Sequence, residues 1–325
     1  MESWICEKMK GLFRKTWFIV LVTAIVTVGA VSGIWLAISR MSAPTYGGYV
    51  AVIKLSGNIA YQKSPISILG ATLTPEDVEE LVEEVEADPY ARAVVLYINS
   101  PGGSASASEE IYNILRRLSE TRPVVAYISE YGTSGGYYIS LAADEIIASP
   151  TSLTGSIGAV SIYLNIQGLA EKLGVRSEVF KSGRFKDIGS PYRELTDEER
   201  RILQSMVNST AKVFVERVRE ARGDKIKDWS EVLTARPYLG LEARELGLVD
   251  DVGDLDKAIS EAKRLAGLPE VAPYRWVKHK PPSLLDLLFG GESMRPIRVS
   301  FELLYMWPPP SPPFQLCLEG VKSPS

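Results

Sequence analysis

The sequence predicts an α/β fold, in which segments with helical periodicity alternate with short apolar strands along most of the chain. The strand predicted at Arg92–Ile98 ("RAVVLYI") is almost continuously apolar, which is typical of a strand buried on both faces. Hydrophobic residues make up 46% of the 325 residues and charged residues 23%, so the chain can bury a sizeable core. Together these observations predict one α/β domain at residues 49–268.

The first predicted element is a membrane anchor at Trp17–Ile38, a run without any charged residue. About 20 apolar residues suffice to cross a bilayer as a helix, and this run reaches that length. A cleaved signal peptide is the alternative, but its apolar region is shorter, about 7–15 residues, and ends at a small-residue cleavage site. Trp17 and Trp35 near the two ends suit the membrane interfaces. We therefore expect an uncleaved transmembrane helix.

Basic residues around this run predict its orientation. Only Arg40 closely follows the run, whereas the basic residues before it are Lys8, Lys10, Arg14 and Lys15. The positive-inside rule then predicts a single-pass protein of the cell membrane, with a cytoplasmic N-terminus at residues 1–16. Everything after Met41, including the α/β domain, is expected to be extracellular.

A linker at residues 39–48 is followed by the first predicted strand, Tyr49–Gly57. A helix is predicted at Thr74–Asp88, because Thr74 can cap its N-terminus and Pro75 fits the first helical position. Asp77 can complete this cap. The apolar residues that recur at helical spacing are Val78, Leu81, Val82 and Val85.

After the strand Arg92–Ile98, apolar residues mark a second helix, at Ile111, Ile114, Leu115 and Leu118. Pro123–Ser129 ("PVVAYIS") is predicted as a third strand. The segments Asp144–Pro150 ("DEIIASP") and Gly158–Leu164 ("GAVSIYL") predict two more short strands.

A long helix is predicted from a capping box at Thr196 and Glu199 to Gly223, which can stop it. Its buried stripe is expected at Leu203, Val207, Phe214 and Val218. The charges from Asp197 to Arg201 are interpreted as a solvated first turn. Two short helices follow within Leu239–Leu268.

Residues 269–325 are rich in proline, as in "WPPPSPPF", and are predicted to form a tail, part of it disordered. The net charge of −4 gives no indication of a nucleic-acid partner. Cys6 and Cys317 would lie on opposite sides of the membrane and near no other ligand type. We therefore expect no disulfide within the chain, no metal site and no cofactor.

Two strand-to-helix junctions carry glycine pairs, Gly102–Gly103 and Gly135–Gly136. Glycine lets backbone N–H groups approach a ligand closely, and a helix N-terminus directs unpaired N–H groups outward. Two such groups that converge on one point form an oxyanion hole for acyl transfer. A simple turn is the plainer interpretation of each pair taken alone. A phosphate loop is not indicated, because no G-x-x-x-x-G-K-[ST] pattern occurs.

Ser134 stands in "YGTSGGYYIS", where a chain can turn sharply and present a hydroxyl at a helix N-terminus. Most serines near helix starts are caps, so this position alone does not establish a nucleophile. The chain's one histidine, His279, is a poor candidate for its base, because it lies in the basic, Pro-rich stretch after the domain. A buried, neutral lysine can serve instead, and Lys181 and Lys186 of "EVFKSGRFKDIGSP" are candidates, although most lysines are solvated.

Several motifs occur here in the order and approximate spacing found in one family: "YINSPGGS", "SGGYYIS", "SLTGSIGAV", "KSGRFKDIGSPYRELTDEE" and "ARELGLVDDVG". Across roughly Tyr49–Leu268 the sequence resembles the signal peptide peptidases of the SppA type. That resemblance implies the fold shared by Clp proteases and crotonases, a spiral of stacked ββα units. The predicted anchor fits this family, and the single copy of the domain fits its short members, which assemble into rings.

The resemblance implies that Ser134 is the nucleophile and that Lys186, rather than Lys181, is the general base. Ser156 of "TGSIG" would hydrogen-bond the lysine amine and help to orient it.

The oxyanion hole implied by the resemblance consists of the backbone N–H groups of Gly103 and Gly135. Gly132 and Thr133 depart from the family, because many members have alanines before the nucleophile. The wall of the pocket is therefore expected to differ there.

The chain is thus interpreted as a membrane-anchored serine endopeptidase that forms a homo-oligomeric ring. Its expected substrates are short hydrophobic peptides, such as cleaved signal peptides, outside the cytoplasm. A crotonase-like acyl-CoA enzyme would share the fold and the glycines, but such enzymes are usually soluble and use carboxylates. A catalytically silent membrane scaffold is the second alternative.

Overall fold

The computed structural model describes residues 20–21, 23–35, 47–63, 71–278 and 304–306. The chain divides into two compact units, Met1–Gly47 and Gly48–Ser325. In the first unit, residues 20–21 and 23–35 are helical and exposed. Among the described residues no helix has both the length and the apolar character that crossing a membrane requires. Residues 17–19, 22 and 36–38 of the predicted anchor lie outside the described residues.

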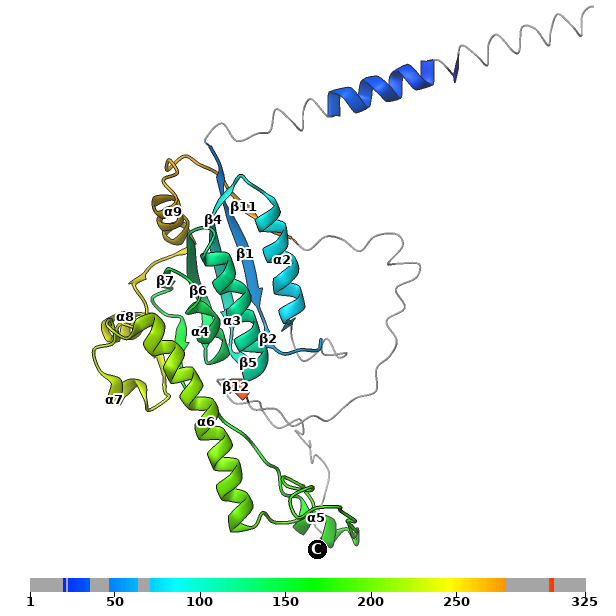
Figure 1. Cartoon of the computed structure of the whole chain (residues 1–325), viewed down its shortest axis with the longest axis vertical. Coiled ribbons are helices and arrows are strands. Elements are labelled where there is room, and N and C mark those ends of the chain that lie inside the picture. Colours follow the sequence, from blue (N-terminus) through cyan, green and yellow to red (C-terminus); the bar gives the residue numbers. More distant parts are fainter. Residues whose placement is uncertain (1–19, 22, 36–46, 64–70, 279–303, 307–325) are drawn as a thin grey trace, which may run out of the picture. The chain divides into compact units, whose positions relative to one another are not determined.

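The second unit is built on a parallel sheet with the strand order β10-β7-β6-β4-β1-β11 (Figure 1). Its strands are β1 (Tyr49–Ser56), β4 (Ala91–Ser100), β6 (Val124–Thr133), β7 (Glu145–Ala148), β10 (Asp251–Val252) and β11 (Tyr274–Trp276). The pairings along this order are parallel. The C-terminal end of β6, after the residues that pair with β7, pairs in parallel with β8 (Leu153–Gly155). β8 in turn pairs antiparallel with β9 (Pro237–Leu239). The α/β fold class predicted from the sequence is confirmed.

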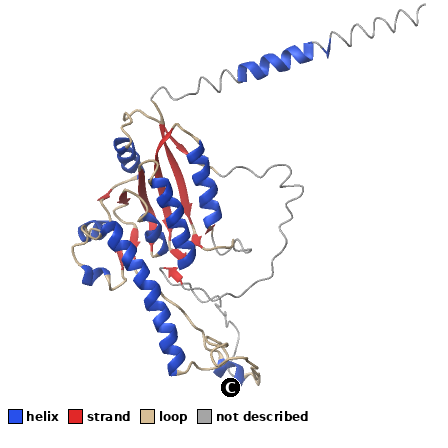
Figure 2. Cartoon of the chain, viewed as in Figure 1, coloured by secondary structure: helices blue, strands red, loops and turns tan. Residues whose placement is uncertain are grey.

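Helices cover both faces of this sheet (Figures 1 and 2). One face packs against α2 (Pro75–Ala87), α3 (Ala105–Ser119) and α4 (Gly135–Ser140), and the other against α9 (Leu255–Leu265). Successive residues of β1 alternate between the two cores: Ala51 and Ile53 lie in the first, Val50 and Val52 in the second. The nearly continuous apolar pattern of the central strands follows, because both of their faces are buried.

A second, smaller sheet has the order β12-β5-β2-β3. It consists of β2 (Asn58–Ile59), β3 (Thr72–Leu73), β5 (Gly102–Ser104) and β12 (Leu304–Met306). β2 and β5 each follow a long strand of the first sheet and precede a helix, so strand–strand–helix units follow one another along the chain. β12 pairs antiparallel with β5, on the edge opposite β2.

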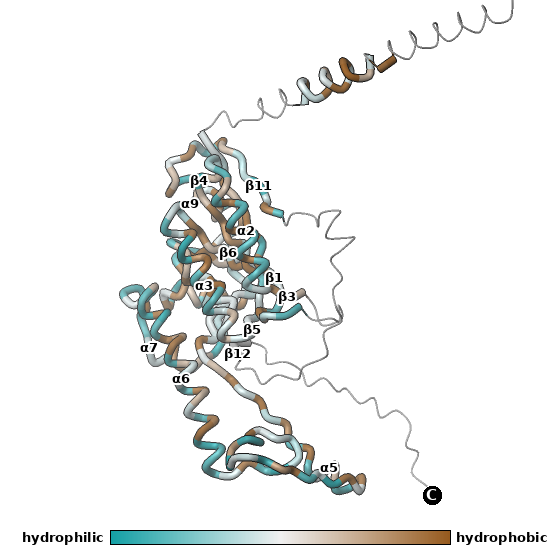
Figure 3. Tube along the Cα trace, turned by 45° about the vertical axis from the view of Figure 1, so that its right-hand side comes forward, coloured by the Kyte–Doolittle hydropathy of each residue, from teal (hydrophilic) through white to brown (hydrophobic). Residues whose placement is uncertain are grey.

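The remaining helices are α5 (Gln167–Lys172), α6 (Asp197–Arg222), α7 (Trp229–Val232) and α8 (Gly240–Leu246). The predicted capping boxes are both present, Thr74 with Asp77 at α2 and Thr196 with Glu199 at α6. Residues 161–196, which we call the arm, contain α5 and lead into α6. In both views the arm lies beside the N-terminal end of α6, away from the sheet, and Figure 3 shows hydrophobic stretches along it (Figures 1 and 3).

The structure departs from the sequence predictions at several places. Gly158–Leu164 forms no strand; the strand in this region is β8, and Ile162 and Leu164 are exposed instead. Residues assigned to the tail form β11, which adds a parallel edge strand beside β1. Glu199 does not belong to a solvated turn, because it is only 2% exposed and binds Arg193.

Candidate active site

Ser134 lies at the end of β6, immediately before α4, in a conformation that L-residues rarely adopt. Its φ is 54° and its ψ is −119°, and the residue is 2% exposed. Its side chain makes no capping hydrogen bond to α4, so the ordinary role of a serine before a helix does not account for it. Strained backbone that the surrounding structure holds in place is characteristic of functional sites. The predicted sharp turn is confirmed.

The two glycine junctions meet beside Ser134. A Cβ atom on Gly135 would lie 3.3 Å from the backbone nitrogen of Gly103 and 3.1 Å from the Cα of Gly102. A Cβ on Gly136 would lie 2.3 Å from the carbonyl oxygen of Ser100. The start of α4 can therefore approach β5 this closely only because glycines stand there. The backbone of Gly103 and Gly135, the residues predicted to form the oxyanion hole, is brought together in space.

Ser156 occupies the equivalent place on the neighbouring strand. Thr133 of β6 pairs with Gly155 of β8, and the backbone N–H of Ser134 donates to the carbonyl oxygen of Gly155 at 2.7 Å. Ser156 therefore leaves its strand next to Ser134, with the same unusual φ of 54° and an exposed fraction of 8%. Other buried polar residues near Ser134 also carry hydroxyl groups, namely Ser100, Ser104, Ser108, Thr133 and Thr154.

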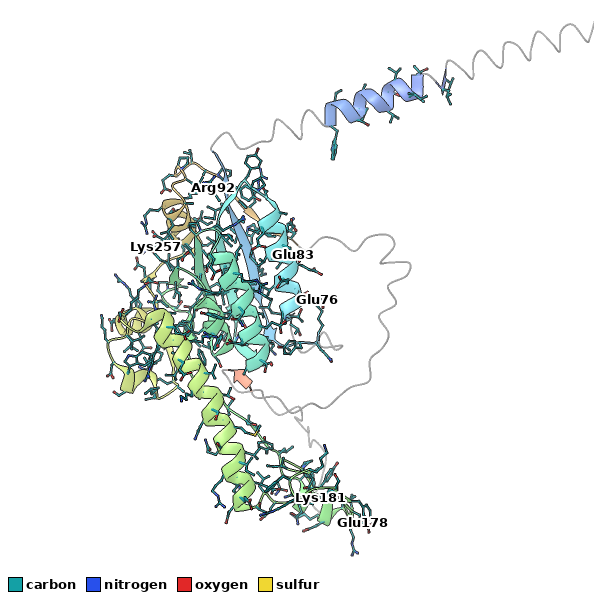
Figure 4. All side chains as sticks on the ribbon, viewed as in Figure 1. Glu76, Glu83, Arg92, Glu178, Lys181 and Lys257 are labelled. Carbon is teal, nitrogen blue, oxygen red and sulfur yellow. The ribbon has the colours of Figure 1, made fainter. Side chains whose placement is uncertain are left out.

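The predicted base lies elsewhere in the chain. Lys186 is an exposed residue of the arm, in a series of turns between residues 183 and 190. Among the described residues, no hydrogen bond joins Lys186 to Ser134 or Ser156. Figure 4 shows Lys181 and Glu178 of the same arm beside the N-terminal end of α6. His279, Cys6 and Cys317 lie outside the described residues.

The length of helix α6 indicates how far apart Ser134 and Lys186 lie within one chain. At its first turn Glu199 binds Arg193 of the arm, whereas further along Phe214 packs on Tyr138 of α4, with ring centroids 4.9 Å apart. The helix rises about 22 Å between Glu199 and Phe214. Arg217 then binds Glu109 of α3 at 2.7 Å, which fixes this half of α6 to the core. One chain thus holds Ser134 at the core and Lys186 at the far end of a long helix.

Both edges of β5 are paired with other strands of the chain. β2 covers one of its edges, and on the other Leu304–Met306 pair antiparallel with Gly102–Ser104. A peptide that adds a strand at such an edge gains backbone hydrogen bonds without regard to its sequence. Because Gly103 belongs to β5, a peptide held there would have its carbonyl groups next to the candidate oxyanion hole.

A buried serine in a strained turn beside two converging glycine junctions has the groups that a serine protease needs, a hydroxyl nucleophile and backbone donors for an oxyanion. Family models agree with this class. The model of peptidase family S49 matches residues 116–269, and that of ClpP-like SDH-type serine proteinases matches residues 10–167.

Relatives extend the match over most of the chain. A putative protease of Methanocaldococcus jannaschii is 31% identical over 279 residues, which cover 82% of this chain and 88% of that protein. A putative protease of Synechocystis is 38% identical over 231 residues, covering 70% of this chain and 83% of that one. The chloroplastic serine protease SPPA of Arabidopsis thaliana is 33% identical over 244 residues, 74% of this chain but 36% of its own length. The chain belongs to peptidase family S49.

Proposed function

We propose that this serine protease is a membrane-anchored endopeptidase that cleaves short hydrophobic peptides, such as spent signal peptides, with a Ser134–Lys186 dyad. The observation that carries the proposal is the buried, uncapped Ser134 beside the backbone of Gly103 and Gly135. Ser134 attacks the scissile carbonyl, the two backbone N–H groups stabilise the resulting oxyanion, and Lys186 takes the proton of the hydroxyl. Ser156 supports the amine of Lys186.

A lysine base must be neutral in the resting enzyme. A free lysine has a pKa near 10.4, so work at pH 7–8 requires a decrease of about 3 units, or about 4 kcal/mol. Burial away from water supplies an effect of this size. Ser134 and Ser156 are buried, and the polar residues packed around them carry hydroxyl groups. This environment suits a neutral amine that enters it from outside.

We propose that a neighbouring copy of the chain supplies this amine, in a homo-oligomeric ring. The distance along α6 supports this, because it separates the Lys186 segment from Ser134 within one chain. The arm also exposes a set of large apolar residues, namely Ile162, Leu164, Leu169, Leu173, Val175, Val179 and Phe180. Phe180 is 92% exposed. Such apolar surface is typical of a protein interface.

We expect a fluorophosphonate probe to label the full-length chain, in detergent or in membranes, at Ser134. Labelling requires an activated hydroxyl beside an oxyanion hole, and Ser134→Ala should abolish both labelling and the cleavage of hydrophobic peptides. Mass spectrometry of the labelled protein identifies the serine. A catalytically silent scaffold would remain unlabelled, and labelling of Ser156 instead would contradict the proposed roles.

Gly135→Ala should lower kcat about 10²–10³-fold, the usual effect of losing one oxyanion donor. The added Cβ would lie 2.5 Å from the Oγ of Ser108 and 3.3 Å from the nitrogen of Gly103, so it pushes the two junctions apart. Gly168→Ala is the matched control, because a Cβ at Gly168 meets nothing within 4 Å. Steady-state cleavage of one peptide by both variants checks this. Equal activity of the two variants would exclude Gly135 from the oxyanion hole.

The proposed orientation places the catalytic domain outside the cell. It rests on the basic residues that precede the apolar run at Trp17–Ile38, compared with Arg40 alone just after it. Protease added to right-side-out vesicles should then digest the domain without lysis. Complete protection that ends only on lysis would reverse the orientation.

A further inference from the structure

Hydrogen bonds on both sides of Lys186 hold the turn that carries it. The backbone N–H of Lys186 donates to Gly183 at 3.1 Å, and that of Ser190 donates to Asp187 at 3.0 Å. Asp187, the next residue, is held by Arg193 through Nε at 2.8 Å and Nη2 at 2.9 Å. A bidentate pair of this kind fixes geometry as well as charge. The backbone next to Lys186 therefore has little freedom.

Arg193 connects this turn to α6. Its Nη1 and Nη2 donate to the two carboxylate oxygens of Glu199, at 2.9 and 2.6 Å. Its other contacts go to Asp187 and to the carbonyl oxygen of Glu194. Glu199 in turn accepts from the backbone N–H of Thr196 at 2.9 Å, as part of the α6 cap. The hydrogen bonds from Arg193, and then that from Thr196, lower the pKa of Glu199 to about 2. Hydrogen bonds from Arg193, and then from Lys181, also lower the pKa of Asp187.

The same contacts separate the two candidate lysines. The amine of Lys181 donates to Asp187 at 2.7 Å and to the carbonyl oxygen of Arg184 at 3.2 Å, so it serves as a positive partner in the turn. Among the described residues no carboxylate pairs with Lys186. The lysine that is free of ion pairs is thus the one to which the resemblance assigns the proton transfer.

Charges around the turn balance. The side chains that form ion pairs around the turn are Lys181, Arg184, Asp187, Arg193, Glu198 and Glu199. Arg184 pairs with Glu198, and the other four form one connected group. As many of these side chains are positive as negative. The ion-paired side chains around the turn therefore carry no net charge as a group.

We propose that Arg193, Asp187 and Glu199 are positioning residues, which hold the Lys186 turn against α6 and balance one another's charges beside that turn. This inference rests on the proposed Ser134–Lys186 dyad. It predicts two separable effects. Loss of the Arg193 hydrogen bonds to Asp187 and Glu199 should make the turn more mobile. Loss of one charge should change the pH at which Lys186 loses its proton.

The test compares charge variants by the pH dependence of kcat/KM, in the full-length chain at low ionic strength. The acidic limb of this profile is the rise in kcat/KM as Lys186 loses its proton. Arg193→Gln leaves an excess negative charge and should raise the pH midpoint of that limb by about half a unit. Asp187→Asn leaves an excess positive charge and should move the limb down by about the same amount. The double variant of both should return the limb to its wild-type position. Arg193→Lys keeps the charge but not the fork, so the limb should stay while kcat falls about tenfold.

Arg117→Gln is the matched control, because Arg117 binds Glu79 at 2.8 and 3.0 Å between α3 and α2. It should move neither the limb nor kcat. Shifts in the same direction for Arg193→Gln and Asp187→Asn would overturn the electrostatic part of the proposal.

Hydrogen exchange of residues 181–190 gives a readout that does not depend on catalysis. Exchange should be faster in Arg193→Gln than in Arg117→Gln, and equal protection would overturn the positioning part whatever the activity. If Lys186→Arg proves active, the dyad itself fails and the proposal fails with it. If Lys186→Arg is inactive and the limbs do not move, the electrostatic part of this inference fails while the proposed dyad stands.

Discussion

Lys186→Arg should be as inactive as Ser134→Ala, with a loss of about 10²–10⁴-fold in kcat, the usual contribution of a general base. Arginine keeps the positive charge and much of the length of lysine, but it cannot be deprotonated in a protein. Lys186 is exposed in its turn, so the larger side chain has room and the fold should survive. Peptide cleavage by the two variants at pH 8, with circular dichroism and sedimentation to verify their folding and assembly, provides the measurement.

His279→Ala is measured alongside these variants, because His279 is the one histidine of the sequence and histidine is the commonest general base. It should turn over peptide at nearly the wild-type rate. If Lys186→Arg retains more than about a tenth of wild-type activity, a loss below ~1.4 kcal/mol, then Lys186 does not take the proton.

Co-expression of Ser134→Ala with Lys186→Arg should restore activity that neither variant has alone. In a ring whose sites combine Ser134 of one copy with Lys186 of its neighbour, random mixing in equal amounts makes about a quarter of the sites complete. Titration with the fluorophosphonate probe after purification through two different tags counts the active sites.

A dyad formed within one chain would give the opposite result. Every site of the mixed assembly would then lack one of its two groups, and no activity would return. Mixing Ser134→Ala with a second inactive variant of the same group, such as Ser134→Gly, is the negative control. Activity in that mixture would indicate contamination by wild-type enzyme.

Local patterns predicted the elements whose formation depends on nearby residues. The caps of α2 and α6 are examples, because Thr74 with Asp77 and Thr196 with Glu199 lie only three residues apart. The turn at Ser134 is another, since the glycines that permit it follow directly in the sequence. These features are encoded within a few residues, so a single sequence suffices to find them.

Features that depend on a distant partner could not be predicted in this way. Glu199 is buried because Arg193 folds back from the arm, and a helical pattern of charges contains no trace of that contact. Gly158–Leu164 has the composition of a strand but forms none, and Ile162 and Leu164 stay exposed. Three residues are too few to show the alternating pattern of a strand, so β11 is recognised only by its pairing with β1.

β12 occupies the edge of β5, so a peptide could pair there only by displacing a segment of the enzyme itself. Leu304–Met306 belong to the same chain as Gly102–Ser104, so their effective concentration there does not fall on dilution; for short flexible linkers such values are in the mM range. A peptide that bound at this edge would compete with the resident strand, and its apparent affinity would be reduced by the fraction of time for which the edge is free. With the edge free about a tenth of the time, the apparent Kd is about tenfold weaker. A peptide that offered only backbone hydrogen bonds would match what it displaces, whereas one that added side-chain contacts would displace β12 more readily, so such an edge would select peptides by a threshold.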